Sequence, residues 1–81
     1  MSKPLSARQA LVLRYVVEHP GATMRQVADA LSLLPKHATF DLEVMYVARL
    51  CGRQAPLWGS LAPATWYAEP KGIEAAEAAL T

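Results

Sequence analysis

The side chains best suited to chemistry in this 81-residue sequence are cations, amides and hydroxyls, not paired catalytic groups. Six of them stand where helices are expected to begin or end. They are Arg25, Gln26, Lys36, His37, Thr39 and Arg53. Cationic side chains neutralise phosphates, and amide, hydroxyl and imidazole groups bond to phosphate oxygens or base edges. The six residues therefore predict a partner that carries phosphates.

Four of these residues belong to an expected third helix and its end. Lys36 would neutralise a phosphate of duplex DNA, while His37 and Thr39 would reach base edges or phosphate oxygens. Arg53, just past the helix, would hold the sugar–phosphate backbone on the other side. Each assignment competes with an ordinary solvated charge or a helix cap.

The other two residues, Arg25 and Gln26, open an expected second helix, where backbone N–H groups favour a bound phosphate. Two acids of the third helix oppose this interpretation. Asp41 and Glu43 are expected to face, or lie near, the same polyanion. Glu43 has one alternative role, as an acceptor for the amino group of cytosine.

Catalytic and metal-binding constellations are not evident in the sequence. His37 has no cysteine or second histidine at metal-ligand spacing, and His19 stands beside a proline at a helix end. Cys51 has no evident base to activate its thiol. The four glycines are scattered and form no phosphate-cradling loop. We therefore expect no enzyme, no catalytic residue, no metal and no cofactor.

The net charge of +1 is small for a protein that binds nucleic acid, but it is unevenly distributed. Residues 1–53 carry seven of the eight lysines and arginines against four acids, whereas the remainder carries one lysine against three acids. This asymmetry favours a binding surface in the first two-thirds of the chain.

The cysteine content and the hydropathy pattern indicate the cellular compartment. A lone cysteine fits a reducing cytoplasm, and no apolar run approaches the roughly 18 residues of a membrane span.

Capping signals in the sequence predict where the first two helices begin. Ser6 with Gln9 predicts the start of a first helix, which is apolar on most sides and ends at His19-Pro20-Gly21. Thr23 with Gln26 predicts the start of a short second helix by the same capping-box logic.

A connection at residues 32–35 leads to the third helix, expected from about Lys36 to Cys51 and ending at Gly52. Two helices joined by a few residues have the outline of a helix–turn–helix. Leu57-Trp58 and Thr65-Trp66-Tyr67 predict a β-hairpin. A final helix is expected over Ile73 to Leu80.

The order of these segments resembles the winged helix–turn–helix transcription regulators over about residues 5 to 78. The residues that carry the resemblance are Leu5-Ser6-x-x-Gln9, Leu13, Pro20-Gly21-Ala22-Thr23, Val27-Ala28-x-x-Leu31, the end of the third helix at Gly52, and Trp66 through Ile73. It implies one mostly helical α+β domain over residues 1–81, with a three-helix core, a β-hairpin wing and a C-terminal helix. It also implies a repressor-type regulator that binds double-stranded DNA as a homodimer. Separately from the resemblance, residues 1–4 are expected to form a disordered arm.

The third helix leaves a second function open, because it is apolar on two sides. One stripe contains Phe40, Val44, Val47 and Cys51, and the other contains Ala38, Leu42 and Met45. One stripe must face the core, and the other is covered by the wing or last helix, or packs on another protein. The expected wing has no lysine or arginine between Gln54 and Ala68. The alternative is a winged-helix protein-interaction module, such as a complex subunit or a small phage-type inhibitor.

Overall fold

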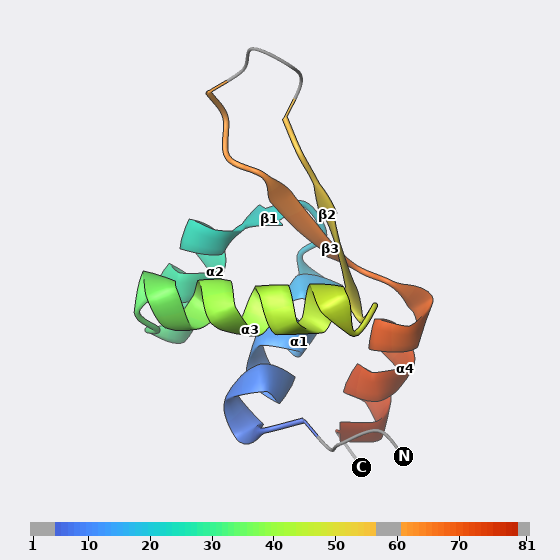
Figure 1. The fold of residues 1–81 in the computed structure, drawn as a ribbon. Coiled ribbons are helices and arrows are strands. Elements are labelled where there is room, and N and C mark those ends of the chain that lie inside the picture. The colour runs from blue at the N-terminus through green and yellow to red at the C-terminus, as the bar shows by residue number, and fades with distance from the viewer. Residues whose placement is uncertain (1–4, 57–60, 80–81) are drawn as a thin grey trace.

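Helix α1 (Ala7–Glu18) lies at the centre of the fold, and three other helices and a small sheet pack around it (Figure 1). The computed structural model describes residues 5–56 and 61–79. Helices α2 (Met24–Leu31) and α3 (Pro35–Val47) pack on α1 and on each other, and α4 (Pro70–Ala79) also packs on α1. No helix in these described ranges is long and apolar enough to cross a membrane.

The sheet is antiparallel and has the strand order β1–β3–β2. Strands β2 (Cys51–Gln54) and β3 (Thr65–Ala68) form the base of the wing that rises above the helices, and β1 (Ala22–Thr23) joins the other edge of β3 (Figure 1). Three core helices, a hairpin wing and a closing helix make up the described chain. The predicted mostly helical α+β architecture is therefore confirmed.

Both capping boxes are present, so the starts of the first two helices follow from local sequence. The Ser6 hydroxyl accepts from the Gln9 N–H at 3.1 Å, and the Gln9 side chain accepts from the Ser6 N–H at 3.2 Å. Thr23 and Gln26 repeat the arrangement at 3.2 and 2.9 Å. Helix α1 ends at the expected place, and Gly21 has a φ of 89°, which glycine adopts without strain.

The prediction for the end of the third helix is wrong. Helix α3 ends at Val47, and the chain reverses at Arg49, whose φ is 64°. Gly52 lies instead in β2, where the Tyr67 ring occupies the space that a Cβ would need. The prediction relied on the rule that glycine usually supplies the left-handed residue after a helix. In this chain Arg49 adopts that left-handed conformation instead.

The remaining boundary predictions have mixed outcomes. The wing begins earlier than expected, because its first described strand starts at Cys51, and the strand expected at Leu57-Trp58 lies outside the described residues. The second wing strand is confirmed by β3, and the last helix begins at Pro70, three residues before its predicted start at Ile73. The disordered arm expected at 1–4 also falls outside the described residues.

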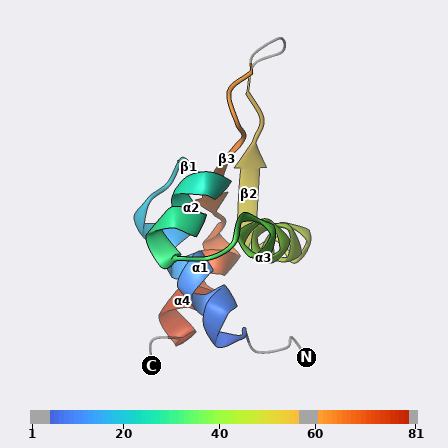
Figure 2. The ribbon, with the colours of Figure 1, turned by 90° about the vertical axis from the view of Figure 1, so that its left-hand side faces the viewer.

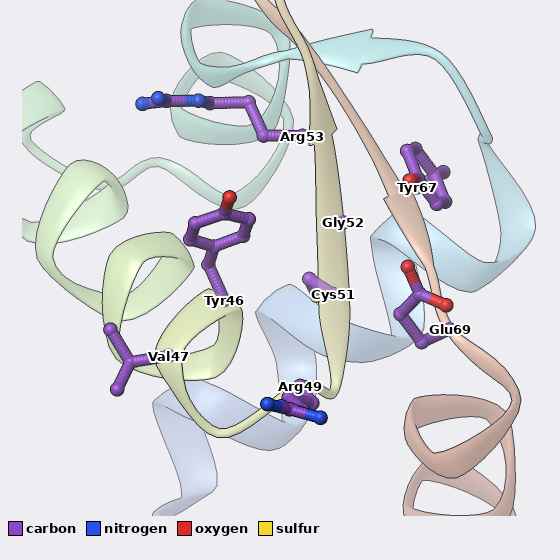
Figure 3. A pocket seen from close by; sticks show the side chains of 8 residues that line it. All are labelled: Tyr46, Val47, Arg49, Cys51, Gly52, Arg53, Tyr67 and Glu69. Atoms are coloured by element: carbon purple, nitrogen blue, oxygen red, sulfur yellow. The ribbon is translucent and has the colours of Figure 1, made fainter.

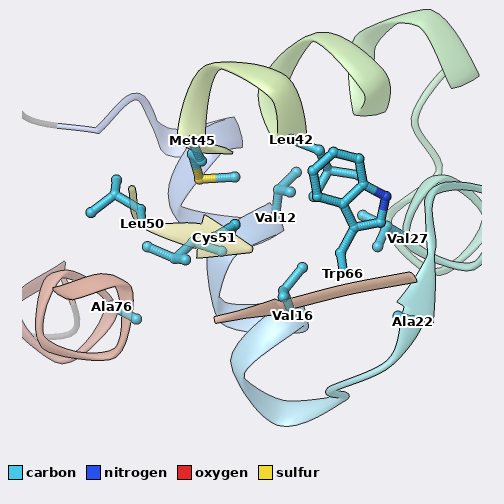
Figure 4. Close-up of a cluster of buried hydrophobic side chains, with 11 residues drawn as sticks. Val12, Val16, Ala22, Val27, Leu42, Met45, Leu50, Cys51, Trp66 and Ala76 are labelled. Carbon is cyan, nitrogen blue, oxygen red and sulfur yellow. The ribbon is translucent and has the colours of Figure 1, made fainter. Parts of the chain in front are cut away.

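The core resolves which stripe of α3 faces inward. Ala38, Leu42 and Met45 are fully buried, and Trp66 of β3 joins the same core at 5% exposure (Figure 4). The part of the opposite stripe that lies on α3 remains exposed: Phe40 keeps 58% of its surface accessible and Val47 keeps 80%. Cys51, which the prediction placed at the end of this stripe, lies in β2 and is buried. In the described chain, neither the wing base nor α4 covers Phe40 and Val47.

A close backbone approach fixes how α4 returns to the core. A Cβ on Gly72 would meet the backbone carbonyl of Leu50 and lie 3.3 Å from the Leu13 side chain. The Glu69 N–H donates to the same Leu50 carbonyl at 3.0 Å. Glycine at position 72 therefore allows the first turn of α4 to sit directly against the corner between α3 and β2.

Candidate nucleic-acid interface

Helix α3 lies at the outer side of the helical bundle, next to the base of the wing (Figure 2). Leu34 precedes it and provides no side-chain cap, while Pro35 occupies its first turn, where a missing N–H costs nothing. The helix is held by its buried stripe and presents its other side to solvent. It is therefore positioned as a surface helix on a rigid support.

The three predicted residues at the start of α3 do not share one face. Lys36 is exposed, whereas His37 and Thr39 are half-buried. Thr39 lies two positions after His37 in the helix, which places their side chains about 200° apart around the axis. Lys36 is thus the predicted residue of this turn that is freely available to a partner.

At the start of α2, Arg25 is exposed and Gln26 is engaged locally. The Gln26 side-chain oxygen accepts the Thr23 N–H at 2.9 Å as part of the capping box. This bond leaves the amide NH₂ of Gln26 as the group that it can offer to a phosphate. Arg25 makes no ion pair with any residue in the described ranges.

Arg53 is positioned by two aromatic rings that come from separate elements. Its guanidinium carbon lies 5.5 Å from the ring centroid of Tyr46 on α3 and 5.9 Å from that of Trp66 on β3. The two rings meet edge to face with centroids 6.2 Å apart. Such stacking restricts the arginine but leaves its N–H groups available for hydrogen bonds. The sequence contained no signal for this platform, because Tyr46 and Trp66 are brought together by the fold.

A surface hollow of about 530 Å³ adjoins this platform at the corner between α3 and the wing (Figure 3). Its lining comes from the end of α3, strand β2 and strand β3. The lining residues are Tyr46, Val47, Arg49, Cys51, Gly52, Arg53, Tyr67 and Glu69. In Figure 3, Arg53 extends from β2 above α3, and Arg49 lies at the turn where α3 joins β2.

Cys51 is the thiol in this hollow, and its environment makes it a poor nucleophile. Burial, and to a lesser degree the negative charge of Glu69, raise the pKa of Cys51 to about 11. The thiol therefore remains protonated at neutral pH, and the thiolate is the reactive form.

The basic side chains divide into two groups by their partners. Arg8 binds Asp41, and Arg14 binds Glu18 on the surface of α1. The other described lysines and arginines have no carboxylate within ion-pair distance in the part of the chain that the structure describes. They are Arg25, Lys36, Arg49, Arg53 and Lys71. Four of these five stand on α2, α3 or β2, or at the turn between α3 and β2.

Asp41 does not face a bound polyanion, so that expectation was wrong. The residue is fully buried and accepts two hydrogen bonds from Arg8, at 2.6 and 3.1 Å. Glu43 is exposed, as expected for the acid beside it. The carboxylate counted against nucleic-acid binding is thus neutralised inside the protein by a residue 33 positions away.

Comparison with known proteins identifies the architecture. No protein-family model matches the chain, and no curated protein matches it either. Among solved structures, a mutant of Staphylococcus aureus MepR bound to an oligodeoxyribonucleotide is similar, with a TM-score of 0.82 and 21% identity over 91% of this chain and 54% of its own.

Two further structures show the same likeness. The transcriptional regulator SlyA gives a TM-score of 0.84 and 21% identity, covering 94% of this chain and 53% of its own. The multiple antibiotic-resistance repressor MarR of Listeria monocytogenes gives 0.80 and 14%, covering 94% and 50%. At these identities the likeness concerns the fold, which is a winged helix–turn–helix, and the chain spans about half the length of these structures.

Proposed function

We propose that this chain is the DNA-binding part of a repressor-type transcriptional regulator, acting in the cytoplasm as a homodimer and without catalysis. The observation that carries the proposal is the distribution of unpaired cations. On α1 the described arginines are neutralised by acids, whereas Arg25, Lys36 and Arg53 stand unpaired around the exposed helix of a helix–turn–helix. The DNA-bound MepR mutant of the same fold supports the same role.

In this mechanism α3 enters the major groove and the base of the wing lies against a neighbouring strand. Lys36 neutralises a phosphate at the entry of α3, and Arg53 reaches the backbone from its aromatic platform. Arg25 and Gln26 contact a phosphate at the N-terminus of α2, where the helix dipole and free N–H groups favour an anion. Regulation follows from occupancy of the operator.

The base contacts come from other residues of α3 than those that contact phosphates. His37 and Thr39 flank α3 on opposite sides, so each would contact a different strand or wall of the groove. The outermost face between them carries Phe40 and Val47, which offer apolar contacts to thymine methyl groups. Specificity in this proposal therefore rests on methyl contacts and on shape as well as on hydrogen bonds.

The size of the electrostatic contribution can be predicted from the number of cations. Three phosphate contacts in each protomer give a slope of about −2.7 for the logarithm of affinity against the logarithm of salt concentration, and a dimer doubles it. Raising salt from 50 to 200 mM then weakens binding about 40-fold for each protomer that is engaged.

Fluorescence anisotropy with random-sequence duplex DNA at these two salt concentrations tests the proposal. We expect micromolar or tighter binding at low salt that falls steeply as salt rises. Lys36→Glu should weaken binding at least about tenfold, since it reverses one contact. Lys71→Glu is the matched control, because Lys71 is also an exposed, unpaired lysine but lies on α4. Absence of binding at low salt would refute the proposal.

One observation favours a second candidate, a protein-interaction module. The outer stripe of α3 leaves Phe40 at 58%, Val44 at 38% and Val47 at 80% exposure, which is unusual for a surface that contacts only DNA. Phe40→Asp and Val47→Asp should then abolish a partner complex while the monomer stays folded. Leu42→Asp is unsuitable for this test, since Leu42 is fully buried and a carboxylate there would unfold the protein.

A further inference from the structure

The turn after α3 places a charged side chain in a conformation that favours glycine. Arg49 has a φ of 64°, and the only other non-glycine residue with positive φ in the described ranges is Ser32, at 55°. At the α3 turn the Leu50 N–H donates to the Met45 carbonyl at 2.8 Å, and the Arg49 N–H donates to the Tyr46 carbonyl at 3.0 Å. This is the hydrogen-bond pattern of a Schellman turn, in which glycine is the residue without strain.

The folded structure does not use the Arg49 side chain that occupies this position. Arg49 is exposed, and its guanidinium makes no hydrogen bond or ion pair with any residue in the described part of the chain. Proximity to the C-terminal end of α3 favours any cation nearby but does not require a left-handed residue. The side chain is therefore available for an external partner.

Two features place Arg49 beside the proposed DNA surface. It lines the same hollow as Arg53 (Figure 3). It also follows the C-terminal end of α3, whereas Lys36 lies in the first turn of that helix. A 13-residue helix is about 20 Å long, whereas the major groove is about 12 Å wide, so residues at both ends of α3 can meet the phosphates that border the groove. An arginine donates two parallel bonds to one phosphate from either position.

We propose that Arg49 and Arg53 form a two-arginine clamp for one segment of the sugar–phosphate backbone of duplex DNA, at the corner between α3 and β2. This inference rests on the proposed DNA-binding function and adds a phosphate site to it. Glu69 lines the same hollow and opposes the anion, so the clamp carries one net positive charge. Both arginines are exposed, which allows them to reach a phosphate without rearranging the core.

The decisive variant is Arg49→Gly, because it removes the side chain and relieves the backbone strain together. We expect about a three- to tenfold loss of duplex affinity at 50 mM salt and a decrease of about one in the salt slope per protomer. The unfolding midpoint should stay the same or rise by up to about 5 °C, since glycine suits this φ. Weaker binding by a protein at least as stable excludes damage to the fold as its cause.

Two matched controls separate the contributions of strain and charge. Ser32→Gly relieves a similar backbone conformation after α2 without changing charge, so it should leave duplex affinity unchanged. Arg14→Ala removes one exposed arginine from α1, where it pairs with Glu18 at 3.0 Å, and should change affinity by less than twofold. Glu69→Gln should tighten binding, because it removes the opposing charge from the hollow.

The outcomes distinguish failure of the two-arginine clamp from failure of the proposed DNA-binding function. If the unaltered protein fails to bind duplex at low salt, the proposed function and the clamp both fail. If it binds with the expected salt dependence but Arg49→Gly keeps the same affinity and slope, only the clamp is overturned. If Arg49→Gly lowers the unfolding midpoint, Arg49→Lys becomes the deciding variant. Duplex binding retained by Arg49→Lys supports a charge contact, whereas a loss of affinity equal to that of Arg49→Gly overturns the clamp.

Discussion

The guanidinium of Arg8 on α1 donates two hydrogen bonds to the carboxylate of Asp41 on α3, from Nε at 2.6 Å and from Nη2 at 3.1 Å. Asp41 is fully buried, whereas 40% of the Arg8 side chain remains accessible. The hydrogen bond to Asp41 raises the pKa of Arg8, so the guanidinium stays charged throughout the accessible pH range. The pair therefore ties the middle of the proposed recognition helix to the start of the central helix.

Removing either partner of this pair should destabilise the fold to different degrees. Arg8→Ala leaves a buried carboxylate without its donor, whereas Asp41→Asn leaves an arginine that solvent can reach. We expect a larger fall in the unfolding midpoint for Arg8→Ala, and a double variant that loses less than the sum of the two. Circular-dichroism melts of the four proteins measure this coupling, and strictly additive losses would contradict it.

Arg14 and Glu18 provide an internal comparison for the same prediction. Their side chains are each 54% exposed and lie one helical turn apart on α1. Arg14→Ala should change the free energy of unfolding by less than about 0.5 kcal/mol, because exposed pairs gain little and are screened by salt. A loss as large as that of Arg8→Ala would mean that burial of Asp41 is not the source of the effect.

Substitution of Arg53 should distinguish its charge from its planar geometry. Arg53→Lys keeps the charge but loses the stacking on Tyr46 and Trp66, so it should retain part of the duplex affinity and show a similar salt slope. Arg53→Ala should weaken binding further and reduce the slope by about one per protomer. Anisotropy titrations at several salt concentrations measure both quantities. Equal losses for lysine and alanine would exclude a charge contact.

Titration of Cys51 should contribute to loss of stability at alkaline pH. Burial and Glu69 raise its pKa to about 11 in the folded protein, from an ordinary value of 9.0. A raised acid pKa means that the folded state binds its proton more tightly, so this contribution is complete below about pH 9 and is lost as pH rises toward 11. Denaturant titrations between these values should show a shallower decline for Cys51→Ala than for the unaltered chain.

Reaction of Cys51 with a thiol reagent is an independent check of the same environment. The native protein should react slowly at neutral pH, because little thiolate is present and the residue is 2% exposed. Denaturant should restore the rate of an ordinary cysteine. Rapid labelling of the native protein at pH 7 would contradict the assigned environment.

The approach of α4 to the corner at Leu50 predicts that Gly72→Ala is destabilising despite alanine's higher helix propensity. Its Cβ would meet the Leu50 carbonyl, which is backbone and cannot move aside, so we expect a loss of about 1–3 kcal/mol. Gly52→Ala is the comparison, because its Cβ would meet the far end of the Tyr67 side chain. Urea unfolding should show the smaller loss at position 52, and the reverse order would contradict this packing.

Much of the helix–turn–helix could be predicted because its signals are local. The capping boxes at Ser6 and Thr23 act over three residues, and the stop at Pro20-Gly21 depends on the backbone limits of two residues. β-propensity also located β3, since Thr65, Trp66 and Tyr67 are residue types that are enriched in strands.

Tertiary structure decided the features that depend on packing between distant segments. Periodicity showed two apolar stripes on α3, but only packing against α1 and α2 decided that Leu42 faces inward and Phe40 outward. Only the fold paired Asp41 with Arg8 and brought the rings of Tyr46 and Trp66 beneath Arg53.

The end of α3 shows where local sequence preferences no longer predict the structure and tertiary packing decides it. A glycine after a helix is a strong local signal, yet Gly52 was needed where the Tyr67 ring crosses β2, and the turn was made by Arg49. Local sequence thus determined where helices begin and which segments are apolar, because those preferences act within one turn. Packing decided which apolar face is buried and where the chain reverses, because those choices depend on contacts made only in the folded molecule.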